Sequence, residues 1–320
     1  MIIVTGGAGF IGANIVAALN HLGRTRILIV DNLEKSDKFL NLRDLRFFDY
    51  QDKREFREAL RQGRWQNIPI TAILHQGACS DTMEYDGRYM MDNNYQYSKE
   101  LFHFAVARKI PFVYASSAAT YGDSSRFAEH PDNENPLNIY GYSKLLFDRY
   151  VAQNMEGVES TVAGLRYFNV YGPREGHKGR MASMVHQLHE QIRRTGRARL
   201  FAGSGGYGNG EQRRDFIHVA DVAAINLALA EQSEPVRGVF NVGTGVSRSF
   251  NDIVASLYQA MNKTPEPIEY VPMPEGLAAK YQNFTEADIS KLLAIRGLEV
   301  RPASLEQGVA AFVRAKEAGL

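Results

Sequence analysis

Tyr140 and Lys144 are the residues whose types and spacing point most directly to chemistry. They lie four residues apart in the segment Asn138-Ile-Tyr-Gly-Tyr-Ser-Lys144. On a helix, their side chains would share one face, one turn apart. The lysine ammonium would favour the tyrosine phenolate, because a nearby opposite charge stabilises the ionised form. An unperturbed tyrosine titrates near ~10, so a base poised near neutrality needs more positive charge than one lysine supplies.

A glycine-rich loop near the start of the chain predicts where that charge would come from. The segment Thr5-Gly-Gly-Ala-Gly-Phe-Ile-Gly12 follows a predicted strand and opens a predicted helix. In such a loop Gly6 permits a tight turn, Gly9 lets the backbone approach a pyrophosphate, and Gly12 allows close helix packing. The helix N-terminus also attracts phosphates. The context favours dinucleotide binding over a ligand-free turn, and a cationic nicotinamide would add the missing charge beside Tyr140.

Asp31 ends the second predicted strand, about 20 residues after Gly12, where a carboxylate commonly binds the adenosine ribose. By itself it favours NAD, because it would repel the 2′-phosphate of NADP. Lys38 and Lys53 could neutralise that phosphate, although a lysine is more often simply solvated. From the residues alone, the choice between NAD and NADP is nearly even.

A cluster of hydroxyl groups lies at the carboxyl end of another predicted strand, in Tyr114-Ala-Ser-Ser-Ala-Ala-Thr-Tyr-Gly122. Open α/β sheets bind their ligands at this edge. We expect Ser117, and less certainly Ser116 or Thr120, to orient the substrate oxygen from which Tyr140 removes a proton. The alternative is that these hydroxyls only cap a turn.

Gly77-Ala-Cys-Ser80 follows a further strand end and would pass beneath the cofactor. Nothing nearby in the sequence activates Cys79, so we interpret it as packing rather than as a nucleophile. Asn93 and Asn94 follow on a long predicted helix, where cofactor contact and structural bracing are equally plausible.

Short apolar runs alternate with amphipathic stretches through the first half of the chain. This rhythm predicts an α/β fold with a doubly wound parallel sheet, a Rossmann domain, and a smaller C-terminal α/β substrate lobe. We expect the cofactor domain to comprise residues 1–168, with 215–247 returning to it, and the substrate lobe 169–214 and 248–320. After Gly172-Pro173 the pattern becomes irregular, with a glycine-rich loop at 203–210 and a proline-rich connection at 264–276. The predicted strands cover residues 2–4, 27–30, 72–75, 112–115, 161–165 and 239–242, and the predicted helices 12–22, 53–62, 89–109 and 220–231.

Composition narrows the functional classes. The 320 residues are 44% hydrophobic and 23% charged, and their formal net charge is +1. This balance argues against electrostatic capture of nucleic acid or of a membrane surface. The single cysteine fits a reducing compartment, and no apolar run approaches the ~18 residues of a membrane span, so we expect a cytoplasmic protein. The eight histidines show no metal-ligand spacing, and no metal is predicted.

Together these motifs resemble the extended short-chain dehydrogenase/reductase superfamily. Longer segments more specifically resemble the ADP-L-glycero-D-manno-heptose 6-epimerase family, over residues 1–288. The most specific segments are Met90-Met-Asp-Asn-Asn-Tyr-Gln-Tyr-Ser-Lys-Glu-Leu101 and Arg166-Tyr-Phe-Asn-Val-Tyr-Gly-Pro-Arg-Glu-Gly-His-Lys-Gly179, supported by Cys79-Ser80 and Ala115-Ser-Ser-Ala-Ala-Thr-Tyr-Gly122.

The resemblance implies interconversion of the two C6 epimers of an ADP-bound heptose for the lipopolysaccharide inner core. It also implies tightly held NADP and a homopentamer, with Lys38 and Lys53 balancing the 2′-phosphate despite Asp31. The further positions that match cofactor contacts are Phe10, Ile11, Asn32, Gln76, Gly77, Ala78, Cys79, Ser80, Asn93, Lys144, Val170 and Lys178. Positions that match substrate contacts are Asn169, Phe201, Ala202, Gly203, Ser204, Arg214 and Tyr281, together with Arg180 and Gln187, where the family would have a serine and a histidine.

The expected reaction needs hydride transfer, because a C–H beside only a hydroxyl is too weak an acid for direct proton removal. Oxidation at C6 gives a ketone, and hydride then returns to its opposite face. The hydroxyl points to different sides in the two epimers, so two bases are needed. Tyr140 serves one epimer, with Lys144 tuning it, and Lys178 serves the other, as the resemblance implies.

Two rival functions remain at this stage. The first is a sister enzyme of the same fold, a nucleotide-sugar 4-epimerase or a 4,6-dehydratase. The dehydratase is disfavoured because Ala118-Ala119 stands where its carboxylate pair would be. The second is a dinucleotide-sensing regulator without turnover, which is disfavoured because the tyrosine, the lysine and the hydroxyl cluster are all retained.

Overall fold

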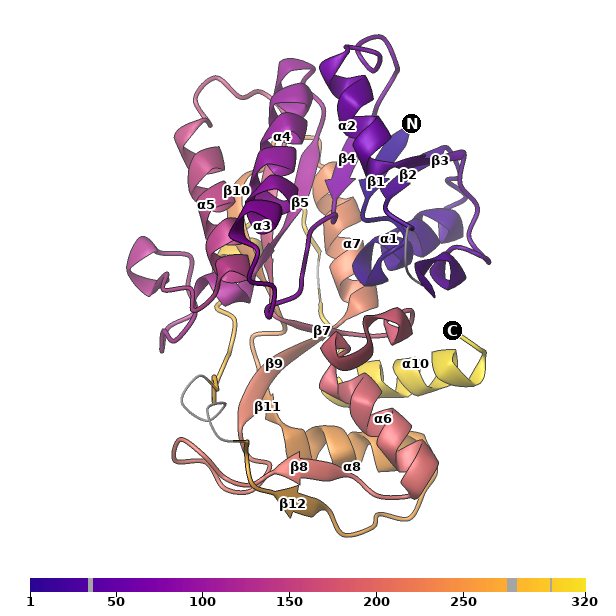
Figure 1. Ribbon diagram of the computed structural model, residues 1–320, viewed down its shortest axis with the longest axis vertical. Helices are drawn as coiled ribbons and strands as arrows, with labels where there is room; N and C mark the ends of the chain where they lie inside the picture. The colour runs from indigo at the N-terminus through magenta and orange to yellow at the C-terminus, as the bar shows by residue number, and fades with distance from the viewer. Residues whose placement is uncertain (34–36, 275–280, 300) are drawn as a thin grey trace.

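The computed structural model describes residues 1–33, 37–274, 281–299 and 301–320. Its upper half in Figure 1 is built on one sheet of seven parallel strands, in the order β10-β6-β5-β4-β1-β2-β3. Between β1 and β4 the order in which the chain adds strands changes from one side of the sheet to the other. Sheets of this kind bind ligands at the carboxyl end of that position. The predicted doubly wound parallel sheet is therefore confirmed. Its strands are β1 (Ile2–Thr5), β2 (Ile27–Asp31), β3 (Asp49–Asp52), β4 (Ala72–His75), β5 (Phe112–Ser117), β6 (Val162–Tyr167) and β10 (Arg237–Val242).

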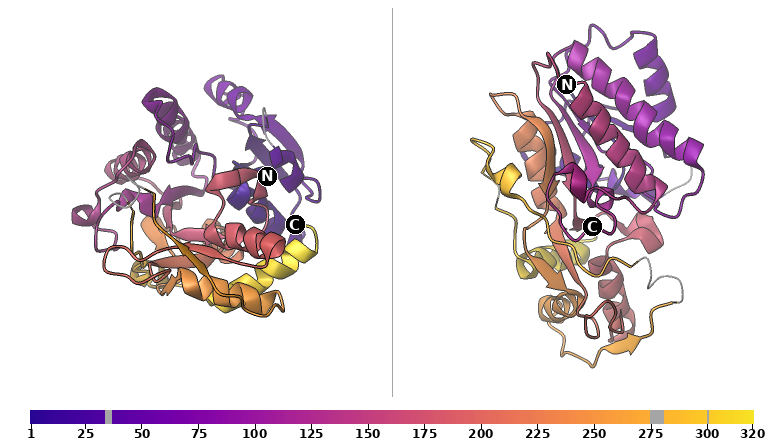
Figure 2. Two further views of the ribbon diagram at one scale, coloured as in Figure 1. Left: turned by 60° about the horizontal axis from the view of Figure 1, so that its bottom comes forward. Right: turned by 90° about the vertical axis from the view of Figure 1, so that its left-hand side faces the viewer.

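Helices cover both faces of this sheet. On one face, α1 and α7 pack their apolar residues against the strands, and on the other α2, α4 and α5 do the same. The side view in Figure 2 shows the two helical layers with the sheet between them. All four predicted helices are present: α1 (Phe10–His21), α2 (Lys53–Arg61), α7 (Val219–Ala230), and the long helix at 87–107. The last is built from α3 (Gly87–Met91), a π-helical turn η2 (Asp92–Gln96) and α4 (Tyr97–Ala107), and α5 (Ile139–Gln153) carries the Tyr140–Lys144 pair.

The lower half of the molecule contains two small sheets and its own core. One sheet has the order β11-β9-β7 and the other pairs β12 with β8. A cluster of buried apolar residues joins them to α6, α8 and α10. The elements are β7 (Asn169–Tyr171), α6 (Met184–Thr195), β8 (Arg199–Phe201), β9 (Arg213–His218), β11 (Ser247–Ser249), α8 (Phe250–Ala260), β12 (Glu269–Val271) and α10 (Leu305–Glu317). The short helix α9 (Ser290–Leu293) returns to the large sheet, where it packs against β10.

The predicted smaller C-terminal α/β lobe is therefore confirmed, although the irregular sequence pattern after Gly172-Pro173 indicated none of these short strands. Among the described residues, four of the five strands in this half are only three residues long, too short for a visible alternation of polar and apolar residues. The glycine-rich stretch at 203–210 is a connection between β8 and β9, as predicted. The proline-rich stretch contains β12, and its last residues, 275 and 276, lie outside the described residues.

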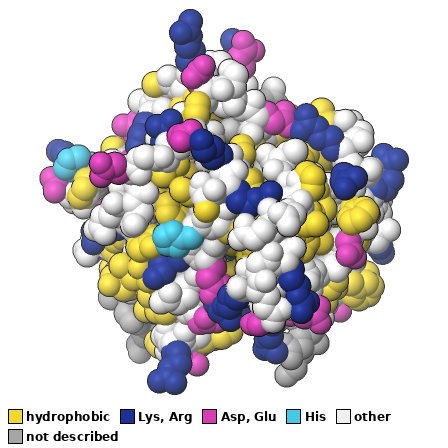
Figure 3. All heavy atoms as spheres, turned by 90° about the horizontal axis from the view of Figure 1, so that it is seen from above, with side chains coloured by type: hydrophobic (Ala, Val, Ile, Leu, Met, Phe, Trp, Pro, Cys, Tyr) yellow, Lys and Arg dark blue, Asp and Glu magenta, His cyan; other side chains and the backbone are white. Residues whose placement is uncertain are grey.

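The surface agrees with the near-neutral composition. Basic and acidic side chains lie interspersed on the face seen from above (Figure 3). Among the described residues, no helix is both long and apolar enough to span a membrane.

Candidate active site

A cleft of about 990 Å³ lies at the carboxyl edge of the large sheet, where the two halves of the molecule meet. Most of the residues predicted from the sequence line it. From the cofactor and catalytic sets these are Gly6, Gly9, Phe10, Ile11, Gly12, Asp31, Asn32, Lys38, Lys53, Gln76, Gly77, Ala78, Cys79, Ser80, Asn93, Ser116, Ser117, Tyr140, Lys144, Val170 and Lys178.

The glycine loop has the geometry of a dinucleotide cradle. Gly6 has a φ of 65°, and a Cβ there would lie 2.7 Å from the Gly77 nitrogen. A Cβ on Gly12 would collide with the Gly6 carbonyl oxygen. Gly9 caps α1 without any side chain, so the first-turn N–H groups face the cleft. The loop thus presents bare backbone and a helix N-terminus, which fit a pyrophosphate.

Asp31 is buried at the end of β2, and its charge is already balanced. Its carboxylate accepts hydrogen bonds from the backbone nitrogen of Ala8 at 2.8 Å and from Lys38 Nζ at 2.6 Å. Lys53 Nζ donates to Asn93 Oδ1 at 2.6 Å, and burial lowers the pKa of Lys53. Lys38 and Lys53 therefore stand at this end of the cleft close to the carboxylates of Asp31 and Asp52.

The π-helical turn places two successive asparagines in different roles. The Asn93 side-chain oxygen accepts a hydrogen bond from Lys53. The Asn94 side chain bonds the backbone of Cys79 twice, accepting from its nitrogen at 2.8 Å and donating to its carbonyl oxygen at 2.9 Å. The Asn94 nitrogen also donates to Ser143 Oγ at 3.0 Å, one residue before Lys144. Cys79 itself is half-buried and burial raises its pKa, which agrees with packing rather than nucleophilic chemistry.

Tyr140 and Lys144 lie on α5, as their spacing predicted. Lys144 is 5% exposed, its Nζ donates to the Ala115 carbonyl at 2.7 Å, and burial lowers its pKa to about 8. Burial raises the pKa of Tyr140, and a hydrogen bond with Ser117 opposes that effect. Lys144 alone does not poise Tyr140 as a base, so ionisation depends on further positive charge in the cleft.

Of the three hydroxyls in the cluster, only Ser117 serves Tyr140. The Thr120 hydroxyl closes the turn by donating to the Ser117 carbonyl at 2.9 Å. Ser116 is 2% exposed, and its hydroxyl donates to Asp148 at 2.8 Å. The turn-capping alternative thus holds for Thr120 and also for Ser117, whose hydroxyl accepts the Ala119 N–H at 3.1 Å, and Ser116 has a structural partner.

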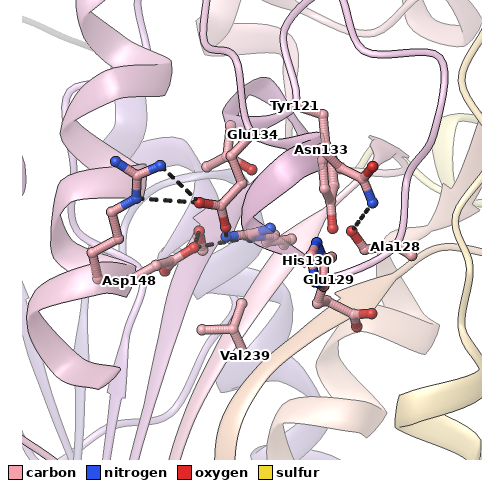
Figure 4. A network of polar contacts seen from close by, with 12 residues as sticks. Tyr121, Ala128, Glu129, His130, Asn133, Glu134, Asp148 and Val239 are labelled. Carbon is pink, nitrogen blue, oxygen red and sulfur yellow. Dashed lines mark hydrogen bonds and ion pairs between the residues drawn. The ribbon is translucent and has the colours of Figure 1, made fainter. Parts of the chain in front are cut away.

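Asp148 belongs to a buried ionic network behind the catalytic residues. Its carboxylate also accepts from Tyr114 and from Arg166 Nε at 3.0 Å, and Arg166 Nη2 donates to Glu134 at 2.5 Å. Glu134 comes from a loop and Asp148 from α5, and the two approach each other in Figure 4. The network fastens α5 to β5 and β6, which fixes Tyr140 and Lys144 relative to Ser117.

Lys178 reaches the cleft from a short 3₁₀ segment, η5 (Gly176–Met181), which is kinked at Gly179 and lies between β7 and α6. Its Nζ lies 5.4 Å from the centroid of the Phe10 ring, and burial lowers its pKa while Glu175 opposes this. Glu175 is 1% exposed and accepts from the Ser183 backbone nitrogen at 2.6 Å and the Ser183 hydroxyl at 2.7 Å. These bonds tie the Lys178 segment to the start of α6.

The opposite end of the cleft belongs to the lower half. Arg214 is buried, with its guanidinium 5.1 Å from the Tyr281 ring, and Phe201 packs edge-on against the same ring at 6.2 Å. Together with Asn169, these residues line the cleft as predicted. A buried guanidinium between aromatic rings suits a nucleoside diphosphate.

Five predicted substrate contacts do not line the cleft: Arg180, Gln187, Ala202, Gly203 and Ser204. Arg180 is exposed and 3.9 Å from Asp81, and Gln187 donates to the Ala182 carbonyl at 2.7 Å. Ser204 bonds Asn283 at 2.7 Å. His186 does not replace the expected histidine, since its ring packs on Phe312 at 6.2 Å.

Sequence reasoning missed several lining residues. Tyr97 is 3% exposed, and within the described part of the chain its hydroxyl has no hydrogen-bond partner. An orphaned hydroxyl in the wall of the cleft is a further indication that the cavity is built for a polar ligand. Tyr97 could have been found from its position four residues after Asn93, on the same helix face. The other missed residues include Asp81, Tyr89, Tyr167, Phe168, His177, Met181, Phe216 and Phe250.

Comparison with known proteins gives the same picture over the whole chain. The NAD dependent epimerase/dehydratase family matches residues 2–243. The ADP-L-glycero-D-manno-heptose-6-epimerase of Alkalilimnicola ehrlichii is 50% identical over 315 residues, which are 98% of this chain and 97% of that protein. The crystal structure of the Helicobacter pylori ADP-L-glycero-D-manno-heptose-6-epimerase superimposes with a TM-score of 0.85 at 31% identity, covering 99% of this chain and 96% of that one. A Thermotoga maritima UDP-glucose 4-epimerase crystallised with UDP-glucose gives a TM-score of 0.80 at 26% identity, with 99% of each chain covered.

Proposed function

Because this chain belongs to the NAD-dependent epimerase/dehydratase family and, within it, to the ADP-L-glycero-D-manno-heptose 6-epimerases, we propose that it interconverts the D-glycero and L-glycero forms of an ADP-bound heptose. The reaction serves the heptose supply of the lipopolysaccharide inner core. The observation that carries the proposal is that two candidate bases, Tyr140 and Lys178, reach one cleft from separate elements.

Each base has the surroundings its role requires. Ser117 accepts the backbone N–H of Ala119 at 3.1 Å, and its own hydroxyl bonds Tyr140, so it can orient the C6 oxygen beside that tyrosine. Burial lowers the pKa of Lys178, which favours the neutral amine that a proton acceptor needs. Tyr140 accepts the C6 hydroxyl proton of one epimer, and Lys178 accepts that of the other.

A nicotinamide dinucleotide fits the bare glycine loop and the Tyr97 hydroxyl, which has no hydrogen-bond partner in the described ranges; when bound, it would supply the hydride acceptor and a positive charge beside Tyr140. We infer that the form used is NADP. The Lys38 ammonium pairs with Asp31, and Lys53 lies near Asp31 and Asp52, so two lysines would offset the repulsion between these carboxylates and a 2′-phosphate. Residues that would hold the dinucleotide are Gly6, Gly9, Phe10, Ile11, Gly12, Asp31, Asn32, Lys38, Lys53, Gln76 to Ser80, Asn93, Lys144 and Val170.

The decisive experiment follows the hydrogen at C6. We expect deuterium placed there to be retained through many turnovers, because the hydride returns to the carbon it left. Loss of the label to solvent would contradict the mechanism. Mass spectrometry of the molecules released by denaturing the purified protein is expected to show NADP.

The sister activities are tested by substrate profiling. The segment η3 (Ala118–Thr120) carries no carboxylate, which opposes a 4,6-dehydratase. Turnover of UDP-hexoses in preference to ADP-heptose would favour a 4-epimerase, and the absence of cofactor reduction with every sugar nucleotide would favour a regulator. A homopentamer and a cytoplasmic location stay predictions, the first checked by native mass spectrometry.

A further inference from the structure

A continuous chain of hydrogen bonds runs through the interior from the cofactor loop to the π-helical turn. The Gly77 backbone nitrogen donates to Thr5 Oγ1 at 3.1 Å, and Thr5 Oγ1 lies 2.6 Å from His75 Nδ1. His75 Nε2 lies 2.8 Å from Ser98 Oγ, which donates to the Asn94 carbonyl at 2.7 Å. These hydrogen bonds link β1 and β4 of the large sheet to the long helix on one of its faces.

Chemistry fixes the direction of this chain. A carbonyl oxygen can only accept, so the Ser98 hydroxyl proton points to Asn94, and Ser98 must accept from His75 Nε2–H. A neutral imidazole carries one proton, so Nδ1 is an acceptor and the Thr5 hydroxyl donates to it. Thr5 in turn accepts from Gly77. Every bond runs the same way, from Gly77 to Asn94.

Burial keeps His75 neutral and makes each link costly to lose. Thr5, His75, Ser98 and Asn94 are at most 2% exposed, and burial lowers the pKa of His75 to about 3. The His75 ring is held in place, stacked on Phe112 at 5.8 Å and edge-on to Tyr97 at 5.4 Å. A broken link would leave a buried donor or acceptor without water to replace its partner.

Both ends of the chain hold the segment that passes beneath the cofactor site. At one end Gly77 is fastened to the glycine-loop strand through Thr5. At the other end Asn94 grips Cys79 through two hydrogen bonds and reaches α5 through Ser143. The residues between these two anchors, 77–79, all line the cleft.

We propose that Thr5, His75 and Ser98 form a directional relay of positioning residues that fixes the Gly77–Cys79 segment and thereby retains the dinucleotide between the two half-reactions. The inference rests on the proposed function, since a cofactor that must give back the hydride it took cannot leave after the first step. None of the three side chains is needed to touch the substrate for this role.

The first test compares two substitutions at one position. Thr5→Val removes the hydroxyl but keeps the shape, whereas Thr5→Ser keeps the hydroxyl. Release of NADPH from the loaded protein is followed by stopped-flow fluorescence after mixing with excess NADP. We expect Thr5→Val to release NADPH roughly tenfold faster, and Thr5→Ser to stay close to the parent protein, because only the valine breaks the relay.

The control is Ser160→Ala, which deletes a buried hydroxyl that lacks a partner within the described residues, just before β6. Its NADPH release should match the parent protein. Equal release from Thr5→Val and the parent would overturn the relay. Failure of the parent protein to bind either NADPH or NADH would instead overturn the proposed function, so the two failures are distinguishable.

The second test reads the relay directly. With ¹⁵N-labelled histidine, His75 should show a protonated Nε2 and an unprotonated Nδ1, and Thr5→Val should shift the Nδ1 resonance. In the double variant Thr5→Val/Ser98→Ala, the fold-increase in the NADPH release rate should be smaller than the product of the two single fold-increases. Either substitution alone already interrupts the series of hydrogen bonds. A proton on Nδ1, or fully independent effects, would contradict the direction or the continuity of the relay.

Discussion

Tyr140 and Lys178 are proposed to perform the same task on opposite epimers, yet the molecule holds them by different means. Tyr140 lies on a fifteen-residue helix that is fastened to the large sheet by apolar packing and by the Asp148–Arg166 ion pair. Lys178 lies on a six-residue 3₁₀ segment held by polar tethers from Glu175. The first base is fixed by the fold as a whole, and the second by a few buried hydrogen bonds. The two sides of the cleft should therefore respond differently to substitution.

The largest effect is expected from removing each base. Tyr140→Phe should slow the oxidation of one epimer and Lys178→Met that of the other, each by about 10²- to 10⁴-fold. Each proton acceptor serves only one orientation of the C6 hydroxyl. Single-turnover reactions started from each pure epimer measure this. If one substitution impaired both directions equally while the other had no effect, a single base would suffice.

A large loss of stability should follow from disturbing the Tyr140 side. Asp148→Asn removes one of the two carboxylates that bind the buried Arg166 and should lower the free energy of unfolding by about 3–5 kcal/mol, measured by urea denaturation. Arg149→Ala removes only the exposed partner of Glu134 and should cost at most about 1 kcal/mol. Similar losses in both variants would argue against a buried network that anchors α5.

Disturbing the Lys178 side should change catalysis more than stability. Glu175→Gln weakens the tether and removes the negative charge that raises the pKa of Lys178. The pKa of Lys178 should fall further, so the rise of the Lys178-dependent half-reaction with pH should move to lower pH. Its maximal rate should fall roughly tenfold as the segment loosens.

The Tyr140-dependent half-reaction serves as the internal reference for that variant, and Glu190→Gln on α6, which loses an ion pair with Arg193, is the matched control. A pH profile that moves upward in Glu175→Gln would contradict the assigned electrostatics.

The smallest effect is expected on the preference for NADP over NAD. This preference should affect the Tyr140-dependent and Lys178-dependent half-reactions alike. Lys38→Met should weaken NADP binding by roughly tenfold and NAD binding less, because it removes a charge opposite the 2′-phosphate, whereas the loss of its ion pair with Asp31 affects both cofactors. Fluorescence titration with NADPH and NADH measures both affinities. Equal weakening of the two would show that Lys38 acts only on Asp31.

The parts of the site that could be predicted are those whose information is local in sequence. The glycine loop and the Tyr140–Lys144 spacing each specify a turn or a helix face within a few residues. β3 was missed because its sequence, Asp-Tyr-Gln-Asp, has no apolar alternation, and it joins the sheet only by pairing with β2. The short strands of the lower half also depend on partners distant in the chain.

The hydrogen-bond partners of individual side chains were the least predictable feature of the site. The sequence ranked Ser117 above Ser116 but gave no structural role to Ser116, and only the structure shows that Ser116 binds Asp148 of α5. Gln187 matched a substrate position by resemblance, but its amide is used within the segment that precedes α6. Contacts of this kind depend on the orientation of side chains, which cannot be derived from the spacing of residues in the sequence.

The π-helical turn carries an evolutionary consequence. It gives consecutive asparagines two separate tasks, with Asn93 on Lys53 and Asn94 on Cys79 and Ser143. Deleting one residue would restore an ordinary helix, but it would rotate everything on one side of the turn by about 100°. Lineages of this protein are therefore expected to exchange residues along this helix freely while leaving its length untouched, and a gap there in a related gene would mark the loss of the cofactor.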